Sequence, residues 1–232
     1  MRRTLLTTAC LAALPTLLAA QVAQQGSPAP TSGDQPGPSK VIFRVGGFMI
    51  NGQRNYSFNN AVQQGTGSVK GVEGLLQGNG IGISFRSLSG SFTNTNGGAA
   101  QPDVISADGN VLLGTPTFNI SIGASKRALS STTTNATRVF TFGRVGCQMS
   151  FLVGGSGLRA QIGAWGYVPA SPDSMKIGGE GEGSIIYTPP VIPFYLQLGY
   201  RTEVFTPKVG RLEAPEEVRG LRIGGGIQFG GK

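Results

Sequence analysis

The chain has 232 residues, of which 38 are glycine, 13% are charged and none is histidine, and its 19 lysines and arginines outnumber its 11 acidic residues. The lack of histidine excludes catalytic arrangements that need an imidazole base, such as Ser-His-Asp and Cys-His sites, and it excludes histidine-ligated metals. The arginines are scattered singly instead of forming basic runs with interleaved aromatics, so no nucleic-acid partner is expected. The composition predicts a protein that is not an enzyme and carries no cofactor or metal.

The first segment has the composition of an export signal. Residues 1–20, MRRTLLTTACLAALPTLLAA, begin with two arginines, continue with an apolar stretch and end in small residues. This order is typical of a Sec-type signal peptide, with cleavage expected after Ala20 or Ala23. An apolar N-terminal helix that stays attached is the alternative. Removal of the signal would leave Cys147 as the only cysteine, and hence no internal disulfide.

Residues 21–39 are rich in Pro, Ser, Gly and Gln, cannot bury enough surface to fold, and are predicted to be a linker. From residue 40 onward, apolar and polar residues alternate with the period of 2 that indicates β-strands. The predicted strands are 41–50, 80–88, 116–125, 138–152, 158–168, 176–187, 193–206 and 219–229. Residues 154–157 and 188–193 are interpreted as short turns. The longer connections are interpreted as 51–79, 89–115, 126–137, 169–175 and 206–218.

The lengths of these segments fit a lipid bilayer. From Phe194 to Val204 the chain takes ten steps of roughly 3.3 Å, about 33 Å in all, which rises about 25 Å at a tilt of about 40°. That rise equals the height of the lipid-facing band of outer-membrane barrels. We therefore predict that residues 40–232 form a single all-β, antiparallel, up-and-down transmembrane β-barrel of about eight strands. A secreted soluble β-sandwich, with its polar face in water, is the alternative.

The signal-like start, the eight alternating segments and the glycine-rich final strand resemble the small OmpA/OmpX-type eight-stranded outer-membrane β-barrels. The final strand carries the alternating apolar residues Leu221, Ile223, Ile227 and Phe229. The resemblance covers about residues 40–232. It implies a monomeric integral protein of the Gram-negative outer membrane. Its implied partners are outer-membrane lipid, lipopolysaccharide and the barrel-assembly machinery.

Charged residues recur singly on the polar faces of successive predicted strands, flanked by glycines. A barrel this narrow has room inside only for side chains, so these charges are predicted to pair with one another in the lumen. The predicted lumen ion-pair cluster consists of Glu180, Glu182, Arg201, Glu203, Arg222, Arg44, Arg159 and Arg86. A hairpin centred between Pro190 and Val191 gives opposed residues that sum to 190 + 191 = 381, which places Glu180 directly opposite Arg201.

The predicted function is that of an integral outer-membrane β-barrel of structural or surface-interaction type, without catalysis. Two alternatives remain open: a narrow transport barrel for small or hydrophobic solutes, and a secreted soluble binding module. Glu180 and Glu182 form a carboxylate pair on one face, as a glycosidase-like dyad or a cation site would require. In a narrow lumen, such residues are more often members of ion pairs.

Overall fold

The computed structural model describes residues 41–58, 61–97, 101–130, 137–154, 157–171, 175–209 and 212–230. The predicted signal peptide and linker, residues 1–39, lie outside the described residues. The strands are β1 (Ile42–Phe58), β2 (Ala61–Gln77), β3 (Gly80–Asn94), β4 (Asp103–Gly114), β5 (Phe118–Ser130), β6 (Thr137–Leu152), β7 (Leu158–Pro169), β8 (Met175–Tyr187), β9 (Phe194–Val209), β10 (Leu212–Glu213) and β11 (Glu216–Phe229). Within the described part of the chain, no helix is long and apolar enough to span a membrane.

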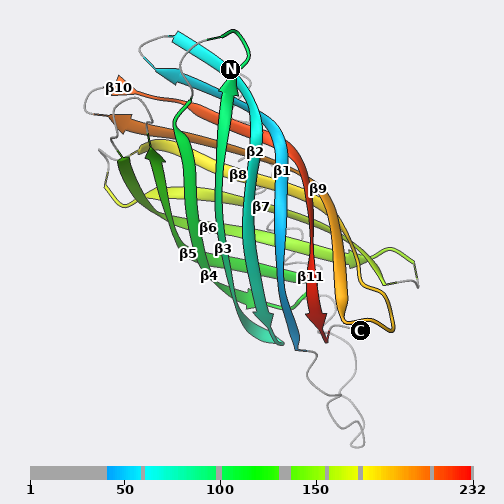
Figure 1. The fold of residues 1–232 in the computed structure, drawn as a ribbon. Coiled ribbons are helices and arrows are strands. Elements are labelled where there is room, and N and C mark those ends of the chain that lie inside the picture. Colours follow the sequence, from blue (N-terminus) through cyan, green and yellow to red (C-terminus); the bar gives the residue numbers. More distant parts are fainter. Residues whose placement is uncertain are drawn as a thin grey trace, which may run out of the picture. The chain divides into compact units, whose positions relative to one another are not determined.

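Ten of these strands close into a barrel (Figure 1). Strands β1 to β9 each pair antiparallel with the next, β9 pairs with β11, and β11 pairs with β1. The closing pair extends from Phe43 opposite Phe229 to Tyr56 opposite Glu216. The two-residue β10 pairs only with the end of β9. The ten strands therefore leave no unpaired sheet edge among the described residues, and the prediction of a closed antiparallel all-β barrel is confirmed.

The prediction of about eight strands is wrong, because the barrel has ten. The two additional strands, β2 and β4, lie in the stretches 51–79 and 89–115 that were interpreted as connections. In β2, the outward side chains toward one end are as polar as the inward ones, so the apolar–polar alternation is weak. The burial pattern of β4 alternates along its whole length, yet its sequence has apolar residues on both faces and does not show this.

The two ends of the barrel differ. We call the end where β1 begins and β11 ends the near end, and the opposite one the far end. At the near end β2 is followed by β3, β4 by β5, β6 by β7 and β8 by β9, and at the far end β1 is followed by β2, β3 by β4, β5 by β6, β7 by β8 and β9, through β10, by β11. The predicted connections at 126–137, 169–175 and 206–218 are thus at the far end, each shortened by strand residues.

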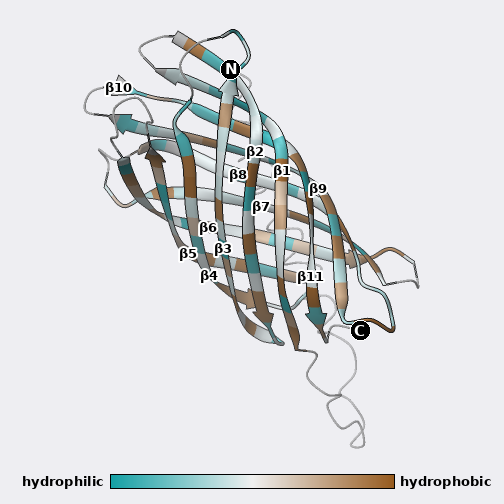
Figure 2. Ribbon diagram, viewed as in Figure 1, coloured by the Kyte–Doolittle hydropathy of each residue, from teal (hydrophilic) through white to brown (hydrophobic). Residues whose placement is uncertain are grey.

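The outward face of the barrel is apolar over the near-end part of the strands. Leu198 is 54% exposed while Arg201, on the opposite face of β9, is 4% exposed. Hydrophobic and hydrophilic residues follow one another along the strands (Figure 2). We call this outward surface the apolar belt. It includes Phe43, Val45, Val72, Leu76, Ile81, Ile83, Phe85, Val111, Leu113, Ile122, Val145, Phe151, Ile162, Ile185, Tyr187, Phe194, Leu196, Leu198, Tyr200, Leu221, Ile223, Ile227 and Phe229.

Aromatic side chains border the belt at the near end, where Phe43 stacks on Phe229 with ring centroids 6.3 Å apart. Tyr187 and Phe194 are also exposed there. Phe205 also lies near a strand end, but it is fully buried and faces the lumen.

Strands β1, β2 and β3 continue beyond the belt toward the far end. There, their outward side chains carry amides and hydroxyls instead of apolar groups. We call this surface the polar extension; it comprises Asn51, Gln53, Asn55, Gln64, Thr66, Ser68, Ser87, Ser89, Ser91 and Thr93.

The lumen is filled by side chains. Its far half holds a hydrophobic cluster of Phe48, Ile50, Val69, Leu88, Phe92, Val104, Leu129, Phe140, Phe142, Tyr167, Met175 and Phe205. Glycines make room for the rings: a Cβ on Gly71 would lie 2.6 Å from the ring of Phe48. Large residues therefore alternate with glycine inside, as a narrow barrel requires.

Candidate functional site

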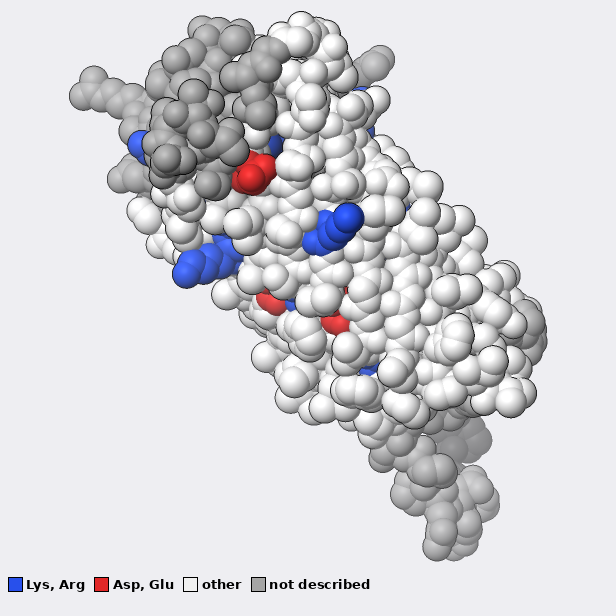
Figure 3. Space-filling view, in the orientation of Figure 1, with Lys and Arg blue, Asp and Glu red and all other residues white. Residues whose placement is uncertain are grey.

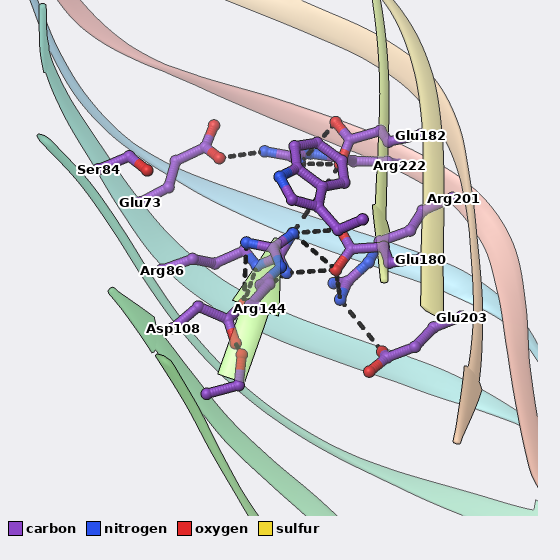
Figure 4. A network of polar contacts seen from close by, with 12 residues as sticks. Glu73, Ser84, Arg86, Asp108, Arg144, Glu180, Glu182, Arg201, Glu203 and Arg222 are labelled. Carbon is purple, nitrogen blue, oxygen red and sulfur yellow. Dashed lines mark hydrogen bonds and ion pairs between the residues drawn. The ribbon is translucent and has the colours of Figure 1, made fainter. Parts of the chain in front are cut away.

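Charged side chains from nine of the ten barrel strands meet in the lumen, and Figure 4 shows the part of this group around Glu180. Six arginines and six carboxylates, with a summed charge of zero, are joined by ion pairs into one continuous group, in which a 4.0 Å contact between Arg86 and Glu182 links the pairs of Arg222 to the rest. The tenth strand, β7, contributes the hydroxyl of Tyr167, whose single O–H lies within hydrogen-bond distance of two carboxylates, 2.8 Å from Glu203 and 3.2 Å from Glu180. We call the twelve charged residues the charge network. They are Arg54, Glu73, Arg86, Asp108, Arg127, Arg144, Glu180, Glu182, Arg201, Glu203, Glu216 and Arg222.

Glu180 is the centre of the charge network. Its carboxylate accepts from Arg86 at 2.7 Å, from Arg144 at 2.9 Å and from Arg201 at 3.2 Å, and the Tyr167 hydroxyl lies 3.2 Å from it. The side chain of Glu180 is completely buried. Removing such a carboxylate from water is costly, and three guanidinium partners offset that cost.

One branch of the network extends toward the near end. Arg222 donates to both carboxylate oxygens of Glu182 at 2.7 Å and also contacts Glu73. Arg86 donates to Asp108 at 2.9 Å as well as to Glu180. This branch links β2, β3, β4, β8 and β11.

A second branch extends toward the far end. Arg201 is 3.1 Å from Glu203, and Glu203 is 2.5 Å from Arg127. Arg127 contacts Glu216, which is 3.1 Å from Arg54. The branch ends where Arg54 donates to a backbone carbonyl oxygen, that of Pro102.

All six cations of the network are arginines, and four of them also lie over aromatic rings; Arg54 lies 5.1 Å from the ring centroid of Tyr56. Arg144 lies 4.4 Å from the ring centroid of Trp165, Arg222 lies 4.4 Å from that of Phe48, and Arg127 lies 5.0 Å from that of Phe205. A guanidinium can stack its flat face on a ring while its N–H groups donate in the plane to two carboxylates, whereas a lysine ammonium has three donors and no flat face. The network is therefore packed as well as paired.

Most of the predicted cluster lies in the network. Glu180, Glu182, Arg201, Glu203, Arg222 and Arg86 are brought together. Arg44 faces the lumen but is not joined to them by an ion pair, and its guanidinium lies 5.2 Å from the ring centroid of Tyr195. Arg159 lies at the near end of β7, opposite Leu152 and Ile186, and the described ion pairs do not connect it to the network.

The predicted hairpin register between β8 and β9 is wrong by two residues. Glu180 lies opposite Glu203, so opposed residues sum to 180 + 203 = 383. The first two residues of β9 extend past the end of β8 and pair instead with β11, where Phe194 faces Ile227. A shift of two residues keeps each side chain on its face, so Arg201 still reaches Glu180 diagonally, at 3.2 Å.

Sequence reasoning missed six members of the network. Arg54, Glu73, Asp108, Arg127 and Glu216 lie in stretches that were interpreted as connections. Arg144 lies inside a predicted strand, 138–152, and alternates there with the outward-facing Val145. The one available signal was this alternation: Arg144 lies on the same face of the strand as Phe140 and Phe142, and that face is the inward one.

Between the network and the near end lies a cavity of about 70 Å³. Its lining is mostly polar and includes Arg44, Glu73, Ser84, Gln148, Gln161 and Trp165. A space of this size holds a few water molecules. Glu180 and Glu182 are both held in ion pairs, and the described residues contain no group of three or more acidic, cysteine or histidine side chains suited to a metal ion. The arrangement is that of a neutral plug.

Comparisons with known proteins give only distant likenesses. No protein-family model and no curated sequence matches the chain. Among solved structures, the chain is similar to the translocator domain of the autotransporter NalP from Neisseria meningitidis, with 11% sequence identity and a TM-score of 0.43 over 96% of this chain and 98% of that one. It is also similar to the CymD monoaromatic hydrocarbon channel, with 11% identity and a TM-score of 0.32 over 82% of this chain and 70% of that one. Likenesses this weak carry no functional argument.

Proposed function

We propose that this chain is an integral β-barrel protein of the bacterial outer membrane, with a structural or surface-interaction role and no catalytic activity. The observation that carries the proposal is the inversion of polarity across the wall. Leu198 and its belt neighbours point outward, whereas the buried Arg201 and its network partners point inward. In water this arrangement would expose a large continuous apolar surface; in lipid it satisfies both faces.

The near end is proposed to face the periplasm. Barrels of this kind place short turns and both ends of the sheet on that side, and they border the lipid band with aromatic rings. Outer-membrane lipid and lipopolysaccharide would surround the belt, and the barrel-assembly machinery would insert it after Sec-dependent export. We propose a monomer, since the sheet closes on itself, and no nucleic-acid partner.

The proposal keeps the general class that the OmpA/OmpX resemblance implied, a narrow single-chain barrel, with two strands more. It assigns no open pore to the protein. The charge network and the hydrophobic cluster together occupy the lumen, and the cavity beside the network is only about 70 Å³. A transport role for small or hydrophobic solutes would require these groups to move.

Membrane fractionation tests the proposal. The protein is expected in the outer-membrane fraction, to need detergent for extraction, and to migrate on gels at different positions before and after heating. A soluble periplasmic protein carried through the same fractionation serves as the control. Recovery of the whole protein in detergent-free periplasmic extract would refute the proposal and favour the soluble binding module.

A further inference from the structure

Charged side chains on the outer wall follow a pattern that the proposed function does not use. The apolar belt contains no charged residue. On β2, β5 and β11, the first outward charged residue met from the near end is a cation: Lys70, Lys126 and Arg219, respectively. We call these three residues the basic collar. All three are exposed.

On β2 and β11 the collar lies at the far border of the belt, whereas beside Lys126 the exposed apolar residues Ile105 and Val139 continue toward the far end on the neighbouring strands. On β11 the outward residues from Phe229 to Leu221 are apolar or glycine, and Arg219 follows. From Phe229 to Arg219 the strand covers about 33 Å and, tilted by about 40°, rises about 25 Å, the height of a lipid band. On β2, Lys70 likewise separates the apolar Val72 from the polar Ser68.

The two lysines of the collar form no ion pair with another described residue, unlike the exposed Lys176. The cross-strand neighbours of Lys70 are Met49 and Ser89, and those of Lys126 are Ala107 and Thr141. Among the described residues, neither lysine has an acidic partner. Figure 3 shows basic groups that project from the wall, with a few acidic groups also visible on the same face.

Arg219 donates to the amide oxygen of Gln53 at 3.3 Å, and Glu217, the next outward residue on its strand, accepts from Asn55 at 3.4 Å. By contrast, the exposed Lys176 pairs with Glu213 at 3.1 Å. The collar therefore offers positive charge at the depth where the phosphates of a lipid headgroup lie.

The polar extension begins directly beyond the collar. Ser68 and Ser89 adjoin Lys70, and Gln53 holds Arg219. Uncharged hydroxyls and amides can exchange hydrogen bonds with the hydroxyls of a sugar. A phospholipid headgroup with a single phosphate has few such hydroxyls. Building on the proposed outer-membrane location, we infer that the basic collar and the polar extension bind the phosphorylated sugar headgroup of an outer-leaflet glycolipid.

The test measures binding of three lipids to the folded barrel in neutral detergent: diphosphorylated lipid A, the same lipid without its phosphates, and phosphatidylglycerol. The wild type is expected to bind diphosphorylated lipid A most tightly. Lys70→Gln should weaken that binding about fivefold, and the triple variant Lys70→Gln, Lys126→Gln, Arg219→Gln about 100-fold, since each cation near an anionic surface contributes about the same factor. Lys70→Arg should retain the affinity.

Lys176→Gln is the matched control: it removes the same charge from an exposed position outside the collar and should leave binding unchanged. Equal binding by the wild type and the triple variant would overturn the inference, as would equal binding of the dephosphorylated lipid. Equally tight binding of phosphatidylglycerol would overturn the glycolipid assignment. Insertion into pure phosphatidylcholine vesicles, scored by the heat-dependent gel shift, tests the proposed function separately, because it does not depend on lipid binding by the collar. A barrel that inserts but shows no lipid preference contradicts only this inference.

Discussion

At the scale of single residues, the most consequential side chain is Glu180. Its carboxylate is completely buried and holds three arginines from three different strands. A buried ion pair adds little net stability over a well-packed apolar substitute, but one that loses a single partner leaves an uncompensated charge. Stability should therefore depend on the balance of the network more than on any one of its contacts.

Arg201→Ala is expected to destabilise the barrel by about 3–5 kcal/mol, because Glu180 and Glu203 each lose a partner. Adding Glu180→Ala restores the equality of cations and anions, so the double variant should lose less stability than the sum of the two single variants. Urea titration of barrels folded in lipid vesicles measures all three free energies of unfolding.

The exposed pair Lys176 and Glu213 supplies the comparison for that cycle. Alanine at either position should change stability by no more than about 1 kcal/mol. Strict additivity of the Arg201 and Glu180 substitutions would contradict a shared network.

At the scale of the strand, period-2 alternation predicted a barrel strand only where the two faces meet different surroundings. β9 shows this well, since its outward side faces the belt and its inward side faces the network. β2 was missed because Lys70, Ser68 and Thr66 lie on its outward face beyond the belt, where polar residues are favourable on both sides. β4 was missed for the converse reason: its inward face includes Val104 and Leu112.

The two outward surfaces should respond differently to the same substitution. Leu198→Arg places a charge in the apolar belt and should cost roughly 2–4 kcal/mol if the site is near the bilayer midplane. Thr93→Arg, on the polar extension, should cost roughly 0–1 kcal/mol. Both sites are exposed, so packing does not differ between them. Folding yield and urea titration in vesicles check the prediction; equal tolerance of both variants would show that the belt does not face lipid.

At the scale of the whole molecule, the filled lumen predicts that the barrel does not conduct ions. The folded wild type should show no stable conductance in planar bilayers, because the network and the hydrophobic cluster leave no continuous aqueous path. A stable conductance that changes with substitution of Arg201 or Glu203 would contradict this expectation and would favour the transport alternative.

The closed barrel and the parity of its charges could be predicted from the sequence, but the strand count and the complete site could not. Arg201 and Glu182 were assigned correctly to the interior because parity within one clear strand is a local property. Glu73 and Asp108 were not assigned to the interior, because they lie on β2 and β4, whose sequences do not show a clear alternation. The hairpin register was wrong by two residues because pairing of Phe194 with β11, a contact between distant parts of the chain, sets where β9 begins.

The contribution of every barrel strand to one polar cluster has a consequence for assembly. Arg54 and Glu216 are 162 residues apart in the chain, and Arg86 and Glu180 are 94 apart. In the proposed lipid environment, a sheet that has not yet closed would hold several of these charges without counterparts. Partly assembled states are therefore raised in free energy relative to the closed barrel, in which every charge of the network is paired. The insertion reaction should therefore be cooperative, slow and nearly all-or-none, as expected for a fold with so many distant contacts.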